Sequence, residues 1–572
     1  MQKFLKIDRA EAILIIIIII AAIFRFYNLN WDQSHHLHPD ERFLTMVTQG
    51  IQWPSSISEY FNTNTSSLNP HNQNFSFFVY GTFPLFLTKL LGEIFKMMDY
   101  ERITLLGRAV SAVFDSLVVL LIYLIGRRVF SSQVGLLSGF LYAISVLPIQ
   151  LSHFYATDTF LNFFLILNLY LLINHLYSER GLWVLFSGIA LGLAMASKIN
   201  AVTFGSVLVV IFLSLLVKQK IKILPPVLFF AFGVFLAFRI FQPYAFQGPT
   251  FFDTHINPKF IQNLQELKNS AQPGSTFPPA VQWNNTAPIL YPLKHMILWG
   301  LGLPLGVASL LGIIFGIYKI SSNVLNSIIY RGWKELLRSE ETIVLTSLIS
   351  GSLLIFIYQG VQVAKSIRYF IIIYPLLSLL SGYFLVEIFN FLSKKTSKNT
   401  LFFIFSILFF ILLIWPIAFF SIYTRPHSRV QASEWIYENI SKGSLLGVEH
   451  WDDGLPLPLD AKRDSALYKF EELPMFAEDS DEKWRILDEK FEKIDYVITS
   501  SNRVYGSVPR APEKYPRTIK YYEDLFTNKL EFKKVAEFTS RPTIFGIEII
   551  DDNADETFTV YDHPKVSIFK KN

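Results

Sequence analysis

Eleven apolar stretches, each about long enough to cross a bilayer, constrain this chain more than any other feature. They cover residues 11–27, 104–125, 133–151, 158–176, 182–197, 200–217, 223–242, 298–318, 342–359, 369–391 and 400–422. A helix needs about 20 mostly apolar residues to span the hydrocarbon core of a membrane. Charged residues make up only 17% of the chain, below the ~25% typical of soluble proteins. The sequence therefore predicts a polytopic α-helical membrane protein with about eleven transmembrane helices.

Basic residues predict the orientation of these helices. Lys3, Lys6 and Arg9 precede the first stretch, and further Lys and Arg residues gather in alternate loops at 127–128, 180, 218–222, 319–338 and 394–398. Because short cytoplasmic loops are enriched in Lys and Arg, the N-terminus is predicted inside and the chain after residue 423 outside. The predicted location is the plasma membrane, which is the inner membrane in a bacterium. A cleaved signal peptide is the alternative for residues 1–27, but the spans that follow favour a retained helix.

Long segments outside the spans predict two large outer loops and a soluble domain. The first loop, residues 28–103, contains an apolar piece at 75–91 that is expected to lie on the membrane surface or re-enter it. The second, residues 243–297, is rich in Pro, Asn and Gln and is expected to cover a site. Residues 1–423 form the predicted membrane domain. Residues 424–572 form the predicted extracytoplasmic α/β or α+β domain, with helices at 428–440 and 481–494 and strands at 444–449, 495–500, 530–538, 543–549 and 558–569.

An adjacent acidic pair, Asp40 and Glu41, follows the first apolar stretch. Charges at a membrane edge are costly unless they have a function, and a carboxylate suits the role of a general base in sugar transfer. The alternative is an ordinary loop pair, salt-bridged to Arg42. The nearby His35, His36 and His38 raise the question of a metal site, since His and carboxylate ligands suit Zn²⁺ or Mn²⁺. With no cysteine in the chain, a thiolate metal site and a disulfide are both excluded.

Three further charged residues lie at predicted outer ends of spans. Asp158 opens a span, where it would orient a sugar hydroxyl or the catalytic loop, or simply cap the helix. Lys198 and Arg368 are positive charges on the face where such charges are disfavoured, and binding a lipid phosphate would explain both. The alternative for these two residues is that their side chains reach the headgroup region as anchors.

Several motifs, taken in order, resemble one family of membrane enzymes. They lie at residues 107–130, 152–164 and 188–202, together with the pair Asp40-Glu41, the segment Phe83-Pro84-Leu85 and the pair Arg368-Tyr369. This set is similar to the GT-C glycosyltransferases of the protein-mannosyltransferase and aminoarabinose-transferase type, glycosyltransferase family 39. The resemblance covers about residues 1–400. Two positions depart from it: Phe83 stands where the family often has Pro, and Thr157 stands before Asp158 where the family often has Pro.

The resemblance implies a multi-span fold with a cavity open to the outside. It also implies an inverting transfer from a polyprenyl-phosphate-linked monosaccharide, with Asp40 as the base, Glu41 as its companion and Asp158 as a carboxylate that shapes the site. In the C-terminal part, Trp451, Asp452 and Asp453 loosely resemble the Trp-Trp-Asp motif of the oligosaccharyltransferase catalytic subunit, which would give them a role in acceptor binding. A polar turn explains the same residues without that role.

These observations predict a glycosyltransferase that moves a monosaccharide from a lipid-phosphate donor to an extracytoplasmic protein, glycan or lipid. The predicted partners are this donor, the acceptor and the bilayer, with no nucleic acid; no cofactor is required, and a divalent metal remains open. The main alternative is a transporter or flippase of lipid-linked glycans. Such a protein should carry broken or ionisable helices at the membrane midplane, related between two halves. An inactive relative whose outer domain binds a partner is a third alternative.

Overall fold

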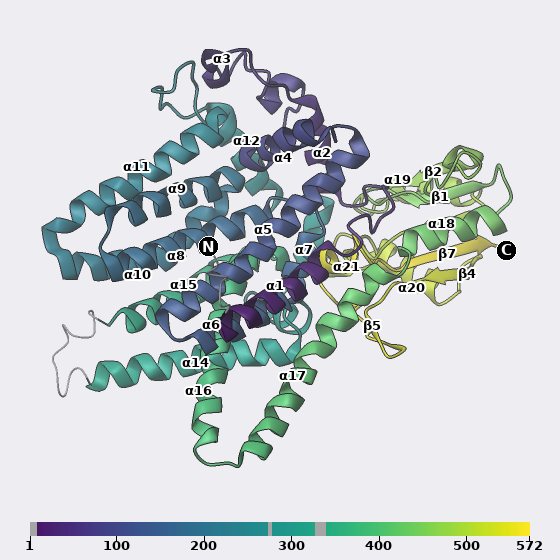
Figure 1. The fold of residues 1–572 in the computed structure, drawn as a ribbon. Helices are drawn as coiled ribbons and strands as arrows, with labels where there is room; N and C mark the ends of the chain where they lie inside the picture. The colour runs from purple at the N-terminus through teal and green to yellow at the C-terminus, as the bar shows by residue number, and fades with distance from the viewer. Residues whose placement is uncertain (1–7, 273–276, 327–338) are drawn as a thin grey trace, which may run out of the picture.

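The computed structural model describes residues 8–272, 277–326 and 339–572 and shows a helical bundle with a sheet-containing domain at one end (Figure 1). A helix lies at each of the eleven predicted stretches. These helices are α1 (Arg9–Phe26), α5 (Tyr100–Val129), the pair α6 (Ser132–Ala143) and α7 (Val146–Ser152), α8 (Asp158–Ser178), α9 (Gly181–Ser197), α10 (Gly205–Gln219), α11 (Leu224–Phe241), α14 (Leu303–Asn326), α15 (Glu340–Gly360), α16 (Tyr374–Ser393) and α17 (Lys398–Phe420).

The prediction of a polytopic membrane protein is confirmed, and the structure also bears on the number of spans. Among the described residues, eight helices are long and apolar enough to cross a membrane, or nine if the α6–α7 pair, bent by 59°, forms one span. Helix α9 has only 17 residues, and α1 carries Arg9, Glu11 and Arg25. The count of eleven therefore remains a prediction. Arg25 is compensated by Asp115 of α5, with 2.6 Å between Nε and Oδ2 and both side chains fully buried, as a charge in a span requires.

Glycines allow the helices of the bundle to approach closely. An added Cβ at Gly188 of α9 would lie 2.2 Å from the carbonyl oxygen of Phe230 in α11, and one at Gly233 would lie 2.4 Å from the carbonyl oxygen of Leu185. Small residues at helix contacts are the usual way for membrane helices to pack, because apolar burial offers little drive in lipid. The α9–α11 contact therefore depends on residues that the sequence supplies on both helices.

The two long loops contain helices of their own. The first loop forms α2 (Pro39–Gly50), α3 (Ile57–Phe61), η1 (Pro70–Gln73) and α4 (Thr82–Phe95), and the second forms η4 (Pro243–Ala245), α12 (Pro258–Ser270), η5 (Pro278–Trp283) and α13 (Leu290–His295). Helix α4 covers part of the predicted non-spanning piece and has 14 residues, too few to span. Figure 1 shows α2, α3, α4 and α12 grouped together beside the bundle.

The C-terminal domain is built around a five-stranded sheet in the order β2-β1-β3-β7-β4. Strand β1 (Leu445–Glu449) is parallel to β2 (Lys469–Leu473) and β3 (Tyr496–Thr499), while β7 (Val566–Lys571) is antiparallel to β3 and β4 (Phe532–Phe538). Helices α18 (Ser428–Asn439), α19 (Asp481–Phe491), α20 (Pro516–Phe526) and α21 (Glu556–Thr559) and the short pair β5 (Thr543–Ile544) and β6 (Ile547–Glu548) complete it. The predicted mixed domain is confirmed, but β2 and α20 were not predicted, and only the end of the predicted strand 558–569 is a strand.

One apolar core joins the bundle to the C-terminal domain. The same cluster of buried residues contains Ile17 of α1, Ile122 of α5, Val430 of α18 and Ile568 of β7. Polar contacts reinforce the junction, since Gln150 Nε2 of α7 donates to Asp562 Oδ2 at 3.0 Å. The two parts share one core, and the division at residue 423 remains a prediction. We refer below to the end of the bundle that contacts this domain as the domain end.

Candidate active site

Asp40 and Arg368 meet at the domain end. Pro39 begins α2, and His38 caps this helix by accepting a hydrogen bond from the Glu41 backbone N–H to Nδ1 at 3.3 Å. Asp40 thus lies in the first turn, while Arg368 lies in η9 (Ile367–Ile373), just before α16. Arg368 Nη2 donates to Asp40 Oδ2 at 2.5 Å, and the side chains of Arg368 and Asp40 are 16% and 27% exposed. The pair is therefore a strong charged hydrogen bond that a ligand can still reach.

The surroundings of Asp40 keep it ionised. Burial on its own would raise the pKa of the Asp40 carboxyl, but the positive charge of Arg368 and hydrogen bonds from Arg368 and Tyr80 hold that pKa well below its usual range. A carboxylate with so low a pKa is a weak base for as long as Arg368 remains its partner. Any ligand that draws Arg368 away would make Asp40 more basic.

Asp158 and Lys198 form a second ion pair beside the first. Asp158 is the first residue of α8, and Lys198 directly follows α9. Lys198 Nζ donates to Asp158 Oδ1 at 2.7 Å, with the lysine side chain 18% exposed and the aspartate 3%. Lys198 Nζ also lies 5.3 Å from the ring centre of Tyr369, the neighbour of Arg368. The four predicted residues Asp40, Asp158, Lys198 and Arg368 are therefore brought together from separate parts of the chain.

Glu41 has surroundings quite different from those of Asp40. Its side chain is fully buried and accepts hydrogen bonds from Arg108 Nε of α5 at 2.8 Å and from the Tyr155 backbone N–H at 2.7 Å. Arg108 Nη2 also donates to Asp32 Oδ2 at 2.7 Å. Burial, together with the nearby Asp32 carboxylate, raises the pKa of Glu41 despite Arg108. This placement favours a role in positioning α2 over direct contact with a substrate.

His36 and His38 of the first loop have different surroundings. His38 is buried between the rings of Phe154 and Tyr561, whose centres lie 4.5 and 4.2 Å from its own, and burial lowers its pKa to about 4. His36 contacts Thr104, with 3.3 Å between Nδ1 and Oγ1. Within the described ranges, no three His, Asp or Glu side chains are arranged to hold a metal ion. The predicted metal role of His35 and His38 therefore gains no geometric support.

Trp451, Asp452 and Asp453 lie where the C-terminal domain contacts the first loop. Arg429 of α18 donates from Nη2 to Asp452 and from Nη1 to Asp453, both at 2.8 Å, and Arg42 of α2 donates to Asp453 at 3.1 Å. Both carboxylates are thus engaged in ion pairs, and the pair between Asp453 and Arg42 connects the domain to α2. Trp451, by contrast, is 44% exposed and is the one residue of the three whose side chain remains available to an acceptor.

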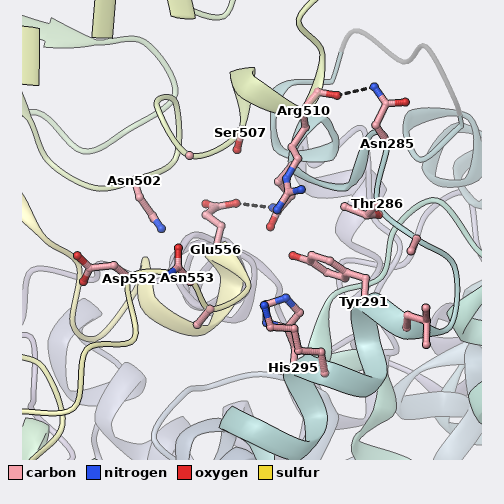
Figure 2. A pocket seen from close by; sticks show the side chains of 16 residues that line it. Asn285, Thr286, Tyr291, His295, Asn502, Ser507, Arg510, Asp552, Asn553 and Glu556 are labelled. Atoms are coloured by element: carbon pink, nitrogen blue, oxygen red, sulfur yellow. Dashed lines mark hydrogen bonds between the residues drawn. The ribbon is translucent and has the colours of Figure 1, made fainter. Parts of the chain in front are cut away.

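Sequence reasoning missed Arg108 and a polar cavity. A lone arginine in an apolar helix requires a buried partner, so Arg108 could have been found inside the motif 107–130. The cavity, of about 460 Å³, lies between the second loop and the C-terminal domain (Figure 2). The second loop contributes Gln282, Thr286, Tyr291 and His295 to its lining, and the C-terminal domain contributes Asn502, Ser507, Arg510, Asp552 and Glu556. No motif marks it, because its walls come from distant segments.

Known proteins with a similar sequence or fold identify the architecture. The family model described as dolichyl-phosphate-mannose-protein mannosyltransferase matches residues 85–246. The oligosaccharyltransferase of Archaeoglobus fulgidus in its apo form is 15% identical, with 96% of this chain and 76% of that chain covered and a TM-score of 0.52. The same enzyme tethered to an acceptor peptide is 14% identical over 91% of this chain and 72% of that chain, again with a TM-score of 0.52.

A more distant likeness is to ArnT from Cupriavidus metallidurans bound to undecaprenyl phosphate, which is 13% identical over 97% of both chains with a TM-score of 0.45. No curated protein matches at the level of sequence. The family segment includes α5 and the turn that carries Asp158, and the shared fold extends across both the bundle and the C-terminal domain. The predicted resemblance is confirmed to this extent: residues 85–246 match the mannosyltransferase family model, and the chain has the fold of a multi-pass membrane protein similar to the oligosaccharyltransferase of Archaeoglobus fulgidus.

Proposed function

We propose that this protein transfers a monosaccharide from a polyprenyl-phosphate carrier to an acceptor outside the cytoplasm. The observation that carries the proposal is the meeting of Asp40, Arg368, Asp158 and Lys198 at the domain end. Two carboxylates and two cations there offer a base, a phosphate-binding pair and a means of orienting hydroxyl groups. The description of the matching family names a dolichyl-phosphate-linked sugar, and the oligosaccharyltransferase of similar fold takes an acceptor peptide; both agree with such a reaction.

The ion pairs suggest how donor binding would prepare the base. Arg368 is the main positive charge next to Asp40. A phosphate that takes the guanidinium as a partner would compensate this charge, so the pKa of Asp40 would rise toward its usual value. Asp40 would then accept the proton of the acceptor as the acceptor attacks the anomeric carbon, and the bond to the phosphate oxygen would break on the opposite side. Base strength is in this way coupled to the presence of donor.

Lys198 and Asp158 would act on the same reacting centre. Lys198 is partly exposed and has Asp158 as its ion-pair partner. It would stabilise the negative charge that develops on the departing phosphate, since fixed cations in a site that excludes water act strongly on developing charge. Asp158 would hold Lys198 in place or accept a hydrogen bond from a sugar hydroxyl. Glu41 and Arg108 would fix the start of α2 and so the direction of Asp40.

The transporter alternative gains no support from these observations. The charged residues of the candidate site lie at the domain end, at or beside the starts and ends of α2, α8, α9 and η9. A transporter would place such residues near the membrane midplane. The matching family is one of mannosyltransferases. Transfer chemistry therefore accounts for the site better than transport does.

Substitution of Asp40 by asparagine tests the proposal. The change preserves size and removes the base, so we expect transfer to fall by about 10²-fold or more while the protein still folds and binds donor. The measurement is release of polyprenyl phosphate and formation of glycosylated product by purified protein in nanodiscs. Asp460→Asn is a matched control, because Asp460 is exposed and forms an ion pair with Arg463 in a turn of the C-terminal domain. Normal transfer by Asp40→Asn would remove Asp40 from the mechanism.

A further inference from the structure

The cavity of Figure 2 has a buried floor and a polar, exposed mouth. Gln282, Thr286, His295, Ser507 and Glu556 are buried, whereas Asn285, Lys294, Arg510 and Asn553 are exposed. Its volume of about 460 Å³ lies in the range of small-molecule sites, about 300–1,000 Å³. The second loop and the C-terminal domain are held together around it, since Trp283 Nε1 and the Tyr291 hydroxyl both donate to Asp555 Oδ2 at 3.0 Å.

Four buried polar atoms in this lining have no hydrogen-bond partner among the described residues. They are Gln282 Oε1, His295 Nδ1, Asn502 Oδ1 and Ser507 Oγ. Three of these side chains are nearly inaccessible, at 4% exposure for Gln282 and His295 and 1% for Ser507. More than about 90% of buried polar groups in proteins are paired, so four unpaired atoms around one cavity are unusual. A ligand that carries hydroxyl groups can supply partners for these atoms.

The chemistry of these atoms defines the ligand. The oxygens of Gln282 and Asn502 can only accept hydrogen bonds, whereas a serine hydroxyl can donate or accept. The buried carboxylate Glu556 is already paired with Arg503, with 2.8 Å between Oε1 and Nε, and Asp552 is paired with Arg541 and Lys565. Because these carboxylates are compensated and the cations Lys294 and Arg510 of the lining are exposed, a neutral ligand suits the buried part of the cavity better than an ion. Groups that both donate and accept, such as hydroxyls, match the lining.

The cavity lies next to the candidate active site. Thr286, in the cavity lining, accepts a hydrogen bond from Lys365 Nζ to Oγ1 at 3.1 Å. Lys365 precedes Arg368 by three residues, and three extended residues span at most about 11 Å. The next residue, Ser366, contacts Thr557 with 2.8 Å between the hydroxyl oxygens. One short segment of chain therefore connects the wall of the cavity to the partner of Asp40.

We propose that this cavity binds the acceptor of the transfer reaction through the hydroxyl groups of a neutral carbohydrate. The assignment of the ligand as acceptor rests on the proposed function, while the binding of carbohydrate does not. The amide, hydroxyl and imidazole groups of the lining would hold one part of the acceptor glycan. The hydroxyl to be glycosylated would extend along the segment of Lys365 toward Asp40.

Binding to the full-length protein in nanodiscs tests this proposal without any donor. The probes are the neutral methyl glycosides of glucose, galactose, mannose, rhamnose and arabinose, with a neutral peptide of Ser, Thr and Gly for comparison, observed by saturation-transfer NMR. We expect at least one glycoside to bind and the peptide not to bind. Ser507→Ala and Asn502→Ala should each weaken glycoside binding by about 5- to 10-fold, because each removes one hydrogen bond.

A matched control separates binding from stability. Ser433→Ala removes another buried hydroxyl of the same domain, but this one donates to the Arg429 carbonyl at 2.7 Å and accepts from Leu457 N–H at 2.8 Å. Ser433→Ala should lower the unfolding temperature and leave glycoside binding unchanged. Ser507→Ala should weaken glycoside binding and leave the unfolding temperature unchanged, since its hydroxyl has no hydrogen-bond partner among the described residues.

Three outcomes would overturn the proposal: no glycoside binds, glycosides bind equally well to both cavity variants, or the peptide binds and the variants weaken it. The proposed catalytic function would fail separately. If glycosides bind in the cavity but Asp40→Asn transfers sugar normally, the carbohydrate site stands and the role of Asp40 falls. If Asp40 is required for transfer and no glycoside binds, the role of Asp40 stands and the carbohydrate site is excluded.

Discussion

At the scale of single residues, two neighbouring carboxylates have opposite surroundings. Successive residues of a helix point about 100° apart, so the first turn of α2 directs Asp40 to the accessible Arg368 and Glu41 into the protein toward Arg108. Burial alone would raise the pKa of both carboxyl groups. At Asp40 the charge of Arg368 outweighs this effect and the pKa is lowered, whereas at Glu41 the pKa stays raised. Adjacent acidic residues thus acquire distinct properties from their partners alone. We infer that Asp40 acts on the substrate and that Glu41 positions Asp40.

Arg368 should matter for the donor more than for the fold. Charged hydrogen bonds contribute about 1.5–3 kcal/mol, so Arg368→Ala should weaken donor affinity by roughly 10- to 150-fold at 1.4 kcal/mol per decade. Arg368→Lys should recover only part of this loss, since lysine lacks the two-donor fork of arginine. Donor saturation in nanodiscs measures both variants.

The control for this prediction is Arg463→Ala, which removes an exposed arginine from a turn of the C-terminal domain. It should leave donor saturation unchanged. If Arg368→Lys restored full affinity, a simple positive charge at the membrane surface would suffice. If donor affinity were unaffected in the alanine variant as well, Arg368 would be an anchor and the phosphate would need another partner.

Sequence spacing alone could not predict which of these residues pair. Asp40 and Arg368 are separated by 328 positions, and Asp158 and Lys198 by 40. Each residue could be identified because a charge at the end of an apolar stretch is costly. The pairing itself depends on how the helices pack, and so does the contrast between Asp40 and Glu41.

At the scale of elements, the position of α4 depends on a glycine at its start. Gly81 N–H donates to the Ser197 carbonyl at 3.1 Å, which places the N-terminus of α4 against the end of α9. An added Cβ at Gly81 would lie 2.0 Å from the carbonyl oxygen of Ala196. The neighbouring Thr82 N–H donates to Gln242 Oε1 at 2.7 Å, so α11 is joined to the same point. Lys198, a residue of the candidate site, directly follows Ser197 in the chain.

Gly81→Ala should therefore destabilise the protein and disturb the site. Overpacking typically costs about 1–3 kcal/mol, and here the obstructing atom belongs to the backbone and has little room to move. Gly205→Ala is a matched control, because Gly205 begins α10 and an added Cβ there meets nothing within 4 Å. That change should be neutral or stabilising by up to about 1 kcal/mol. Thermal unfolding in detergent measures both, and equal stability of the two variants would contradict the packing argument.

Strand β2 and helix α21 were not predicted from the sequence, and in each case there is a physical reason. Strand β2 reads Lys-Phe-Glu-Glu-Leu, and its residues are mostly exposed, so it lacks the alternation of apolar and polar residues that marks a half-buried strand. It is a strand because its backbone pairs with β1. The predicted strand 558–569 begins instead with α21, where Asp555 caps the helix by accepting from Thr557 N–H at 3.1 Å. Local capping there outweighed the pattern.

At the scale of the whole molecule, a buried charged cluster fastens the C-terminal domain to the bundle. His563 lies between Asp551 and Asp562, and all three side chains are buried. Asp562 also accepts hydrogen bonds from Gln150 of α7 and from the Tyr423 hydroxyl at 3.0 Å. Burial would lower the pKa of His563, but the two carboxylates raise that pKa to about 10. The histidine is therefore positively charged at neutral pH and holds the cluster together.

This cluster makes stability depend on pH. Since the pKa of His563 is raised from 6.5 when unfolded to about 10 when folded, its contribution is complete below pH 6.5 and is lost as the pH rises through about 10. The unfolding temperature should fall between these values. His563→Gln should unfold at a lower temperature near pH 6.5 and lose most of this pH dependence. An identical pH profile in both proteins would show that His563 is not the titrating group.

The orientation of the C-terminal domain remains a proposal, supported by the basic residues of alternate loops. We expect residues 424–572 to lie outside the cytoplasm and the N-terminus inside. Protease treatment of intact and of inverted membrane vesicles measures this, with the loop at Lys394–Lys398 as the cytoplasmic reference. Cleavage of the C-terminal domain only in inverted vesicles would place the candidate site in the cytoplasm and exclude the proposed acceptor.

The sequence by itself determined the class of this protein, because membrane spans and their flanking charges are local properties of composition. It also indicated the individual residues Asp40, Asp158, Lys198 and Arg368, since charges beside apolar helices are conspicuous in one dimension. Only the tertiary structure decided which charges pair, that Glu41 is buried, and that distant segments enclose a cavity whose lining residue Thr286 contacts Lys365. These features arise between segments far apart in the chain, where side-chain packing and not local pattern sets the distances.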